Sequence, residues 1–591
     1  MKKILILFSA VIPLLMGCES TFLDLDPLDA TTESAFFNSP DDFEAAANSF
    51  YRGLQSHSPK NAYGGGSWNS GFADITDFGT DFTAWVQPEG QGATTVGNTD
   101  IYWHNWYGYL REVNILLKKA EEYNGNPSDI SRHVAEAYFF RAWHHFSLLR
   151  RFGGVPLATK LFDVGEEALY GPRNSRYEVV EQILADLDLA MATGLPDVIP
   201  DTEIGKIGKY AAQAFKAEVL LYEATWEKYV GTDTDGDGIT VGAGSAKPSG
   251  YPTVDAMLDS AVQTAKSVMD NGGYEIWNHN DVLDNLSYRH LFILDDVSNN
   301  AGLGKSTNKE YIIQSVFDGV LQTPGGNFSH TTGGRNAPTR HILDLFLSLD
   351  GLPIDKSPLF QGYYLMTDQF IDRDYRMISY FGENLPVGGG SLPMTGISST
   401  SLSPITNRKF RAYSYQDGRE TYNYPQLRYA EVLLTYAEAL YERDGAISDA
   451  DLNLSINILR DRAGVAHLTN AFVTTNNLDM LEEIRRERSV ELYMENNRYN
   501  DLKRWGIAEE VLGQDLIGEV IEGTEYETNP ALYNPAAYIY GTKKVQTGKG
   551  LLDAVIIDPE NVRNFSQKNY LFPIPSAQIT LNPALKQNPD Y

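Results

Sequence analysis

Two blocks of helical periodicity, separated by a long stretch without it, constrain this fold more than any other feature of the sequence. Apolar residues in the first block recur at every third or fourth position, which is the spacing of one buried helix face. The pattern predicts helices at residues 41–54, 101–123, 130–151, 176–192, 207–229 and 253–271. In the second block it predicts helices at 427–443, 449–463 and 478–498. We therefore expect a mainly α-helical scaffold at about 41–272 and 427–512.

Several of these helices combine small residues with tyrosines. Alanine lets two helix backbones approach closely, and closely packed helix pairs are typical of tetratricopeptide-like repeats. The spacing between the pairs is irregular, so an ordinary helical core stays open as an alternative. The alanines concerned are Ala135, Ala137, Ala142, Ala211, Ala212, Ala214, Ala217, Ala430, Ala437 and Ala439.

The stretch between the two blocks, residues 273–426, is rich in Gly, Ser, Thr, Asn and aromatic residues. It shows little periodicity apart from short pieces such as 339–349. We interpret it as a loop-rich insertion into the helical scaffold. Residues 513–591 have the pattern of loops with short extended pieces, so residues 41–591 are expected to form a single domain.

The N-terminus has the pattern of an exported protein. Two lysines precede an apolar run at residues 4–16, which would span only about 20 Å as a helix, too short for a bilayer. Such a run is typical of a signal peptide, here residues 1–17. Leu15, Gly17 and Cys18, the only cysteine, resemble the lipobox of bacterial lipoproteins, in which the cysteine is acylated. We expect Cys18 to carry a lipid anchor and residues 18–40 to form a tether; a plain secretory signal with an incidental cysteine is the alternative.

Charge argues against two kinds of partner. The formal net charge is −30, and loss of the two leader lysines leaves 46 basic against 78 acidic residues, or −32. Recognition of nucleic acid needs a basic footprint, so nucleic acid is not an expected partner. Electrostatic adhesion to anionic lipid is disfavoured for the same reason, so membrane contact is expected through the lipid anchor alone.

Several sequence blocks resemble the SusD/RagB family, and they occur in the family's order from one end of the chain to the other. One of them, Phe22-Leu23-Asp24, stands shortly after the cysteine. The others are Arg141-Ala142 with Phe152-Gly153-Gly154-Val155-Pro156; Pro425-Gln426-Leu427-Arg428-Tyr429-Ala430-Glu431 with Tyr436-Ala437-Glu438-Ala439; Arg485-Arg486-Glu487-Arg488 with Glu491-Leu492, Arg498-Tyr499 and Arg504-Trp505; and Pro573-Ile574-Pro575 with Asn582-Pro583.

The resemblance implies a lipoprotein exposed on the outer membrane of Bacteroidetes-type bacteria. It also implies a SusD-like fold, mainly α-helical, in which tetratricopeptide-like helix pairs support a loop-rich ligand face. Such proteins bind glycan oligosaccharides, cover a SusC-like TonB-dependent outer-membrane barrel as a lid, and deliver the nutrient to it. The chain is therefore not expected to be an enzyme. Two competing hypotheses are a surface glycoside hydrolase on a helical scaffold and a structural adhesin.

The charged residues of these blocks have a structural interpretation of their own. Arg428, Glu431 and Glu438 lie on one predicted helix, and Arg488 and Glu491 lie on another. Opposite charges on adjacent helices can pair, and such pairs fix helix register when they are buried. We expect these residues to belong to the scaffold.

Sugars present apolar C–H faces and a rim of hydroxyl groups, so a glycan site needs exposed aromatic rings beside polar side chains. The loop at 56–99 has this composition, and aromatic residues there have no helical stripe that would bury them. The insertion offers further candidates, including arginines that can donate to hydroxyl groups. The candidate ligand residues are Tyr63, Trp68, Asp81 and Trp85 in the loop and Trp277, Arg335 and Arg340 in the insertion.

An acidic turn resembles the start of a calcium-binding loop. Asp233, Asp235 and Asp237 stand at alternate positions and Gly238 follows. The twelfth position is Gly244, where an EF-hand requires a bidentate glutamate, so an EF-hand is excluded. A looser calcium site and a solvated acidic turn both stay open, and no cofactor is required by the sequence.

Overall fold

A computed structural model describes residues 36–54, 77–163, 165–231, 247–320, 337–382, 403–414, 420–537 and 540–591. Several predicted features lie outside these ranges and stay predictions: the signal peptide, the lipidated Cys18 and six candidate ligand or metal residues. Within the described part of the chain, no helix is both long and apolar enough to cross a bilayer. The candidate residues outside the described ranges are Tyr63, Trp68, Asp233, Asp235, Asp237 and Arg335.

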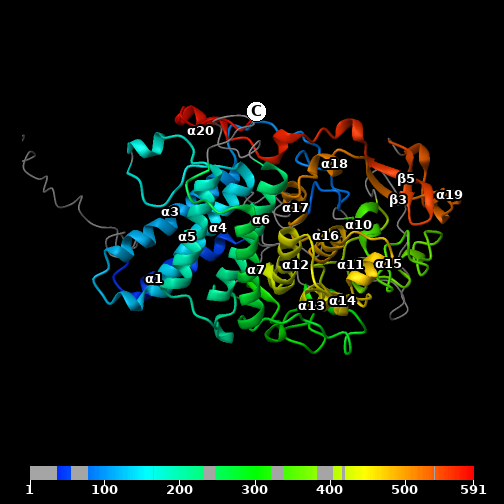
Figure 1. The fold of residues 1–591 in the computed structure, drawn as a ribbon, viewed down its shortest axis with the longest axis horizontal. Helices are drawn as coiled ribbons and strands as arrows, with labels where there is room; N and C mark the ends of the chain where they lie inside the picture. The colour runs from blue at the N-terminus through cyan, green and yellow to red at the C-terminus, as the bar shows by residue number, and fades with distance from the viewer. Residues whose placement is uncertain are drawn as a thin grey trace, which may run out of the picture.

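The described chain is mainly α-helical, as the periodicity predicts (Figure 1). The helices of the first block are α1 (Pro40–Phe50), α3 (Ile101–Glu121), α4 (Ser131–Phe152), α5 (Arg176–Thr193), α6 (Lys209–Tyr229) and α7 (Val254–Asn271). Those of the second block are α12 (Tyr429–Asp444), α13 (Asp449–Leu454), α14 (Ile456–Ala463), α16 (Met480–Glu491), α17 (Arg498–Arg504) and α18 (Ala508–Leu512).

Two helices that the periodicity predicts as continuous are broken. The helix expected at 449–463 is interrupted at Ser455, whose φ and ψ of −134° and −95° are not helical. The helix expected at 478–498 ends at Glu491, and Met494 and Asn496 have positive φ in the turn before α17. Neither break contains a proline or a glycine, so the periodic pattern continues across both.

The helices pack in sequential pairs, as the alanines predict. α4 lies against α5 and α6 against α7, and α12 packs on both α7 and α16. Ala135, Ala212 and Ala437 are fully buried between these helices. Figure 1 shows α1, α3, α4 and α5 at one end of the molecule and α12 with its neighbours beside α6 and α7.

The insertion is tied to the scaffold by a short sheet and has a core of its own. Strand β1 (Tyr311–Ser315) pairs antiparallel with β2 (Tyr424–Arg428), and β2 leads directly into α12. A second hydrophobic cluster joins insertion residues such as Phe292 and Tyr380 to Tyr493 and Met494, which follow α16. This shared core holds the turn before α17 against the insertion.

The extended pieces predicted after residue 513 form a small antiparallel sheet. Its strands are β3 (Leu516–Val520), β4 (Thr542–Thr547) and β5 (Gly550–Asp558), in the order β3-β5-β4. The sheet lies at the opposite end of the molecule from α1 and packs β3 against the short helix α10 (Arg340–Leu345) (Figure 1).

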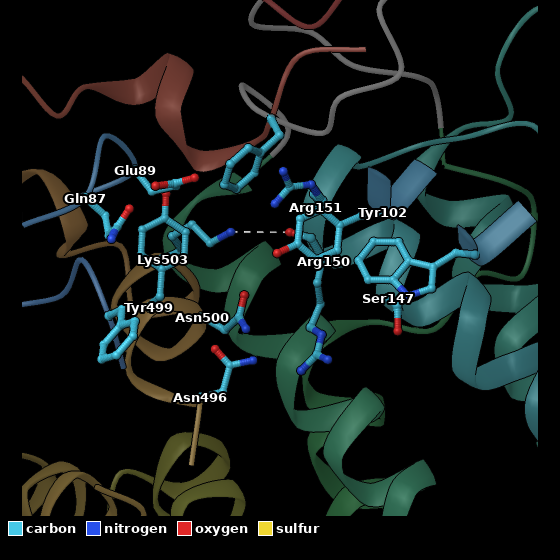
Figure 2. Close-up of a pocket in the computed structure, with 13 residues that line it drawn as sticks. Gln87, Glu89, Tyr102, Ser147, Arg150, Arg151, Asn496, Tyr499, Asn500 and Lys503 are labelled. Atoms are coloured by element: carbon cyan, nitrogen blue, oxygen red, sulfur yellow. Dashed lines mark hydrogen bonds between the residues drawn. The ribbon is translucent and has the colours of Figure 1, made fainter. Parts of the chain in front are cut away.

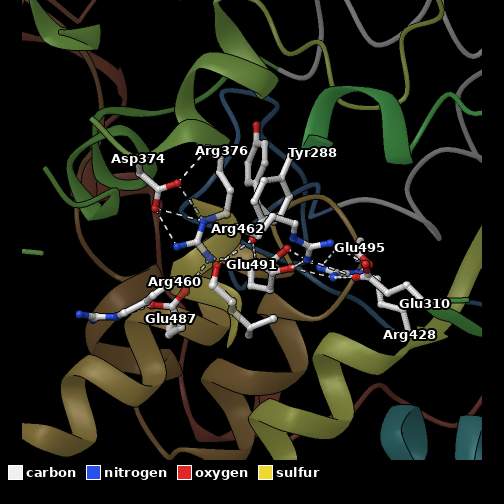
Figure 3. A network of polar contacts seen from close by, with 12 residues as sticks. Tyr288, Glu310, Asp374, Arg376, Arg428, Arg460, Arg462, Glu487, Glu491 and Glu495 are labelled. Atoms are coloured by element: carbon white, nitrogen blue, oxygen red, sulfur yellow. Dashed lines mark hydrogen bonds and ion pairs between the residues drawn. The ribbon is translucent and has the colours of Figure 1, made fainter. Parts of the chain in front are cut away.

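The predicted charge pairs across helices are confirmed, and they are buried. Arg488 pairs with Glu431 at 2.9 Å, and Arg428 pairs with Glu491 at 2.7 Å. Figure 3 shows that Glu491 lies at the centre of a larger network that reaches into the insertion, where it meets Arg376. The network therefore joins β2, α14, α16 and the insertion in one place.

Candidate functional site

The start of the loop at 77–99 is fixed to the turn before α17. The carboxylate of Asp77 accepts hydrogen bonds from the backbone N–H groups of Met494 and Arg498. Four residues on, the carboxylate of Asp81 accepts two hydrogen bonds from the guanidinium of Arg498, at 2.8 and 3.0 Å. These bonds hold the beginning of the loop beside the C-terminal half of the scaffold.

Asp81 is committed to these internal partners. Its side chain is buried and also lies 3.1 Å from Nε2 of His341. Burial alone would raise the pKa of Asp81, but Arg498 and His341 hold that pKa below its ordinary value. Asp81 also lines the cavity at Arg340 described below, so its contact with a sugar stays a prediction, while its bonds to Arg498 give it a positioning role for the loop.

Trp85 folds back onto the same loop. Its ring stacks on Phe78 with centroids 5.0 Å apart and an angle of 20° between the planes. Trp85 stays partly exposed, and Phe78 in turn forms part of a pocket between the loop and the helices. Trp85 therefore lies next to a pocket whose wall includes Phe78 but not Trp85 itself.

We call this cavity the α4–α17 pocket (Figure 2). It has a volume of about 170 Å³ and opens to solvent at the junction of five chain segments that are distant in sequence. Its wall is formed by Phe78, Gln87 and Glu89 of the loop, Tyr102 and Trp106 of α3, Ser147, Arg150 and Arg151 of α4, Asn496, Tyr499, Asn500 and Lys503 at α17, and Phe572.

Three polar side chains of the pocket have no hydrogen-bond partner among the described residues. They are the amides of Gln87 and Asn500 and the carboxylate of Glu89, all partly exposed. Amides both donate and accept, and a carboxylate accepts, so the three groups together match the donors and acceptors of vicinal hydroxyl groups. The half-buried rings of Tyr102 and Tyr499 lie beside them and offer apolar faces.

Arg151 is a fixed part of the wall. Its guanidinium lies 3.7 Å from the ring centroid of Phe572 and 4.1 Å from that of Tyr102. It also pairs at 2.8 Å with Asp100, which caps the N-terminus of α3 by accepting from the N–H groups of Tyr102 and Trp103. Arg151 thus joins the ends of α3 and α4 and the C-terminal segment.

Lys503 is a buried residue of the pocket wall. Its ammonium donates to the carbonyl oxygen of Arg150 at 3.3 Å, the dashed contact of Figure 2, and only 1% of the residue is exposed. Burial lowers the pKa of Lys503 well below its ordinary range, and the neighbouring Arg151, Arg150 and Arg176 lower it further.

Arg340 lines a second cavity, of about 400 Å³, between α10 and β3. Its side chain is buried and is held by ion pairs with Asp344 at 2.8 Å and Glu519 at 3.4 Å. It also donates to Gln369 at 2.8 Å. Arg340 therefore joins α10 to the C-terminal sheet. Most of the N–H donors that were expected to meet sugar hydroxyl groups already contact protein groups.

The placement of Trp277 corrects the prediction that it offers a face to a ligand. Only 3% of the residue is exposed, and it lies in the core of the insertion. Its indole N–H donates to Thr307 at 3.0 Å and its backbone N–H donates to Glu310 at 2.9 Å. The carboxylate of Glu310 also belongs to the buried charge network. The network therefore fixes the group that holds the backbone of Trp277 in the core.

Most of the α4–α17 pocket is not predicted from the sequence. Tyr499 occurs there only within a family-like block, and Gln87, Arg150, Asn500 and Lys503 are not singled out. The signal available was weak: Asn496, Tyr499 and Asn500 lie at the end of the helix predicted at 478–498 and just beyond it. Only the turn at 492–497, which the periodicity does not predict, directs them to α4.

The fold defines the class of this protein before any comparison: a scaffold of helix pairs that carries a long insertion with its own core and an open polar and aromatic pocket. Comparison with known proteins agrees. The sequence pattern of the SusD family matches residues 292–591, and a second family, described as starch-binding associating with outer membrane, matches residues 22–221. The chain belongs to the SusD family.

Individual relatives extend over nearly the whole chain. A SusD-like protein P2 of Formosa agariphila is 25% identical over 541 residues, which cover 87% of this chain and 92% of that protein. A SusD-like protein of Bacteroides ovatus is 22% identical and covers 100% and 98%.

Two solved structures show the same fold. A SusD-like carbohydrate binding protein of Bacteroides fragilis superposes with a TM-score of 0.69 at 23% identity, covering 93% of this chain and 99% of that one. A laminarin binding SusD-like protein gives 0.58 at 17% identity, with the same two coverages.

Proposed function

We infer that this protein captures glycan oligosaccharides at the α4–α17 pocket. The observation that carries the proposal is the set of unpartnered polar groups beside aromatic rings, because a sugar presents hydroxyl groups at its rim and C–H groups on its faces. The amides of Gln87 and Asn500 and the carboxylate of Glu89 supply the polar contacts. Relatives described as carbohydrate-binding and laminarin-binding support the same ligand class.

Delivery to a transporter completes the proposal. We infer that Cys18 is acylated, that the chain is held to the outer membrane by this lipid, and that it works as the lid of a SusC-like TonB-dependent barrel. The lipobox-like sequence and the description of the matching family as associating with the outer membrane support this. Conversion of Cys18 to serine should abolish labelling by radioactive palmitate, and a tagged protein should co-purify with a TonB-dependent barrel from detergent-solubilised outer membranes.

Affinity electrophoresis tests glycan capture. The purified protein is run through native gels that contain one polysaccharide each, and retardation identifies the ligand. Asn500→Ala and Gln87→Ala each remove an amide that has no hydrogen-bond partner among the described residues, so the fold should persist and retardation should fall by about three- to tenfold for the loss of one hydrogen bond. Gln361→Ala is a matched control, because Gln361 is exposed in the insertion and its amide donates to Leu359.

Two outcomes would contradict the proposal. Unchanged retardation in both pocket variants would place the ligand elsewhere on the molecule. Shortening of labelled oligosaccharides during incubation would show that the chain is a glycoside hydrolase rather than a binding protein.

A further inference from the structure

One wall of the α4–α17 pocket is basic, although the chain as a whole is strongly acidic. Arg150, Arg151 and Lys503 lie together on this wall, whereas Glu89 is the one carboxylate among the described residues that line the pocket (Figure 2). At physiological ionic strength charges farther than about 8 Å are largely screened, so a ligand in the pocket responds to this local excess of positive charge.

The protein balances these three basic side chains incompletely. Arg151 is paired with Asp100 at 2.8 Å, but Arg150 reaches Glu218 only at 3.5 Å. Burial, together with the repulsion of Glu431, raises the pKa of Glu218 to about 7, so this partner is partly uncharged at neutral pH. One weak contact therefore leaves most of the five N–H donors of the Arg150 guanidinium available.

Lys503 is the more unusual residue of the set. No carboxylate among the described residues pairs with it, and the charged groups that act on it most are three arginines. Its single hydrogen bond goes to a carbonyl near the C-terminus of α4. A helix C-terminus carries only about half of a negative charge, so it does not compensate a buried ammonium. A residue of the same length without charge would be cheaper to bury there.

We propose that the α4–α17 pocket receives the anionic substituent of an acidic glycan, a sulfate ester or a uronate carboxylate, between Arg150 and Lys503. This rests on the proposed function, since it specifies the class of glycan that the same pocket takes. The planar fork of Arg150 matches two oxygens of either group. The unpartnered amides of Gln87 and Asn500 then bind the neighbouring hydroxyl groups, and Glu89 faces the uncharged part of the sugar.

Matched pairs of glycans separate charge from shape. The probes are oligogalacturonide with its methyl ester, and carrageenan oligosaccharide with its desulfated form, and dissociation constants are measured by titration calorimetry. The wild type should bind at least one acidic member about tenfold or more tightly than its neutral counterpart, which is the effect of one hydrogen bond to a charged group. The two pairs distinguish carboxylate from sulfate.

Charge-removing variants locate the effect. Arg150→Met and Lys503→Met should each reduce the ratio of the acidic-glycan affinity to the neutral-glycan affinity about tenfold. Lys309→Met is the matched control, because Lys309 is exposed and pairs only with the exposed Glu275. Lys503→Met also tests folding: if Lys503 serves only to cap α4, this variant should lose thermal stability and keep the wild-type preference for charge.

The outcomes are separable. Binding of neutral and acidic members with equal affinity, or an unchanged preference in both variants, overturns the inference and leaves glycan capture standing. Binding only to glycans that belong to neither pair also overturns the inference and leaves glycan capture standing. Failure to bind any glycan in the panel removes the proposed function and the inference together.

Discussion

Replacement of Glu491 by glutamine removes the charge at the centre of the buried network. One carboxylate oxygen accepts from Arg428 and from Arg462, each at 2.7 Å, and the other accepts from Arg376 at 2.9 Å and from the hydroxyl of Tyr288 at 2.7 Å. The three arginines hold the pKa of Glu491 far below its ordinary value, against the effect of burial. The carboxylate is therefore ionised at neutral pH.

The loss follows from this geometry. A glutamine keeps one acceptor oxygen and turns the other into a donor, so two of the four hydrogen bonds are lost and like groups face each other. The network then carries one uncompensated buried positive charge, because its six acidic and six basic residues were balanced. Breaking a buried pair by removal of one partner costs about 3–5 kcal/mol. The balanced set is Glu310, Asp374, Glu483, Glu487, Glu491 and Glu495 with Arg376, Lys409, Arg428, Arg460, Arg462 and Arg486.

Differential scanning calorimetry at pH 7 measures the effect. For roughly 550 residues that unfold together, the unfolding entropy is about 1.2 kcal/mol/K, so 3–5 kcal/mol lowers Tm by about 3–4 °C. Glu275→Gln is the matched control: Glu275 and Lys309 form an exposed pair at 3.1 Å, and such a pair contributes less than about 1 kcal/mol. If Glu491→Gln lowers Tm no more than the control does, the prediction is wrong, because the network then tolerates an uncompensated charge.

Three further predictions concern a buried histidine, a core tryptophan and the acidic turn. His145 is neutral, because its Nδ1–H donates to the Arg141 carbonyl at 3.0 Å and its Nε2 accepts from the Ala158 N–H at 3.2 Å. Burial and Arg141 lower its folded pKa to about 3. The unfolded chain binds this proton below pH 6.5, so stability falls by about 1.4 kcal/mol per pH unit between pH 6.5 and 3, and His145→Gln should flatten that part of the denaturation profile. Trp277→Ala should lower stability by about 3–5 kcal/mol through the cavity it leaves and should not alter glycan affinity, which would be measured below Tm; a selective loss of affinity would restore Trp277 as a ligand residue. Calorimetric titration with calcium should give a binding isotherm that disappears when Asp233, Asp235 and Asp237 are changed to asparagine, and its absence in the wild type would leave the acidic turn without a metal.

Helix positions could be predicted because each buried face repeats along one continuous segment. The prediction of 207–229 and the observed α6 at Lys209–Tyr229 differ by two residues. The break at Ser455 could not be predicted, since its cause lies outside the segment. α14 is rotated so that Arg460 and Arg462 point into the charge network, where they meet Glu487 and Glu310. Nothing local in the sequence encodes those partners.

The candidate site was predictable only in its composition. Aromatic and polar residues in a loop indicate exposure when no periodic face exists to bury them, and this reasoning succeeds in part for the partly exposed Trp85. It fails for Trp277, because a residue in an aperiodic segment can still lie under a strand, here against Glu310 at the start of β1. The pocket unites segments near residues 87, 150 and 500, and no pattern within one segment predicts which other segments it meets.

The charge network and the pocket meet at the turn between α16 and α17. Glu491 and Glu495 fix one side of this turn through Arg428, while Asp77 binds the backbone of Met494 and Arg498 from the other side. The turn directs Asn500 into the pocket, and the bonds of Asp77 place the loop that carries Gln87. A pocket whose two halves are fixed at one rigid turn is already ordered before the ligand arrives, so binding loses little conformational entropy. On the proposed function, the buried charges would contribute to glycan affinity without touching the ligand, and Glu491→Gln should weaken binding by loosening both halves of the pocket at once.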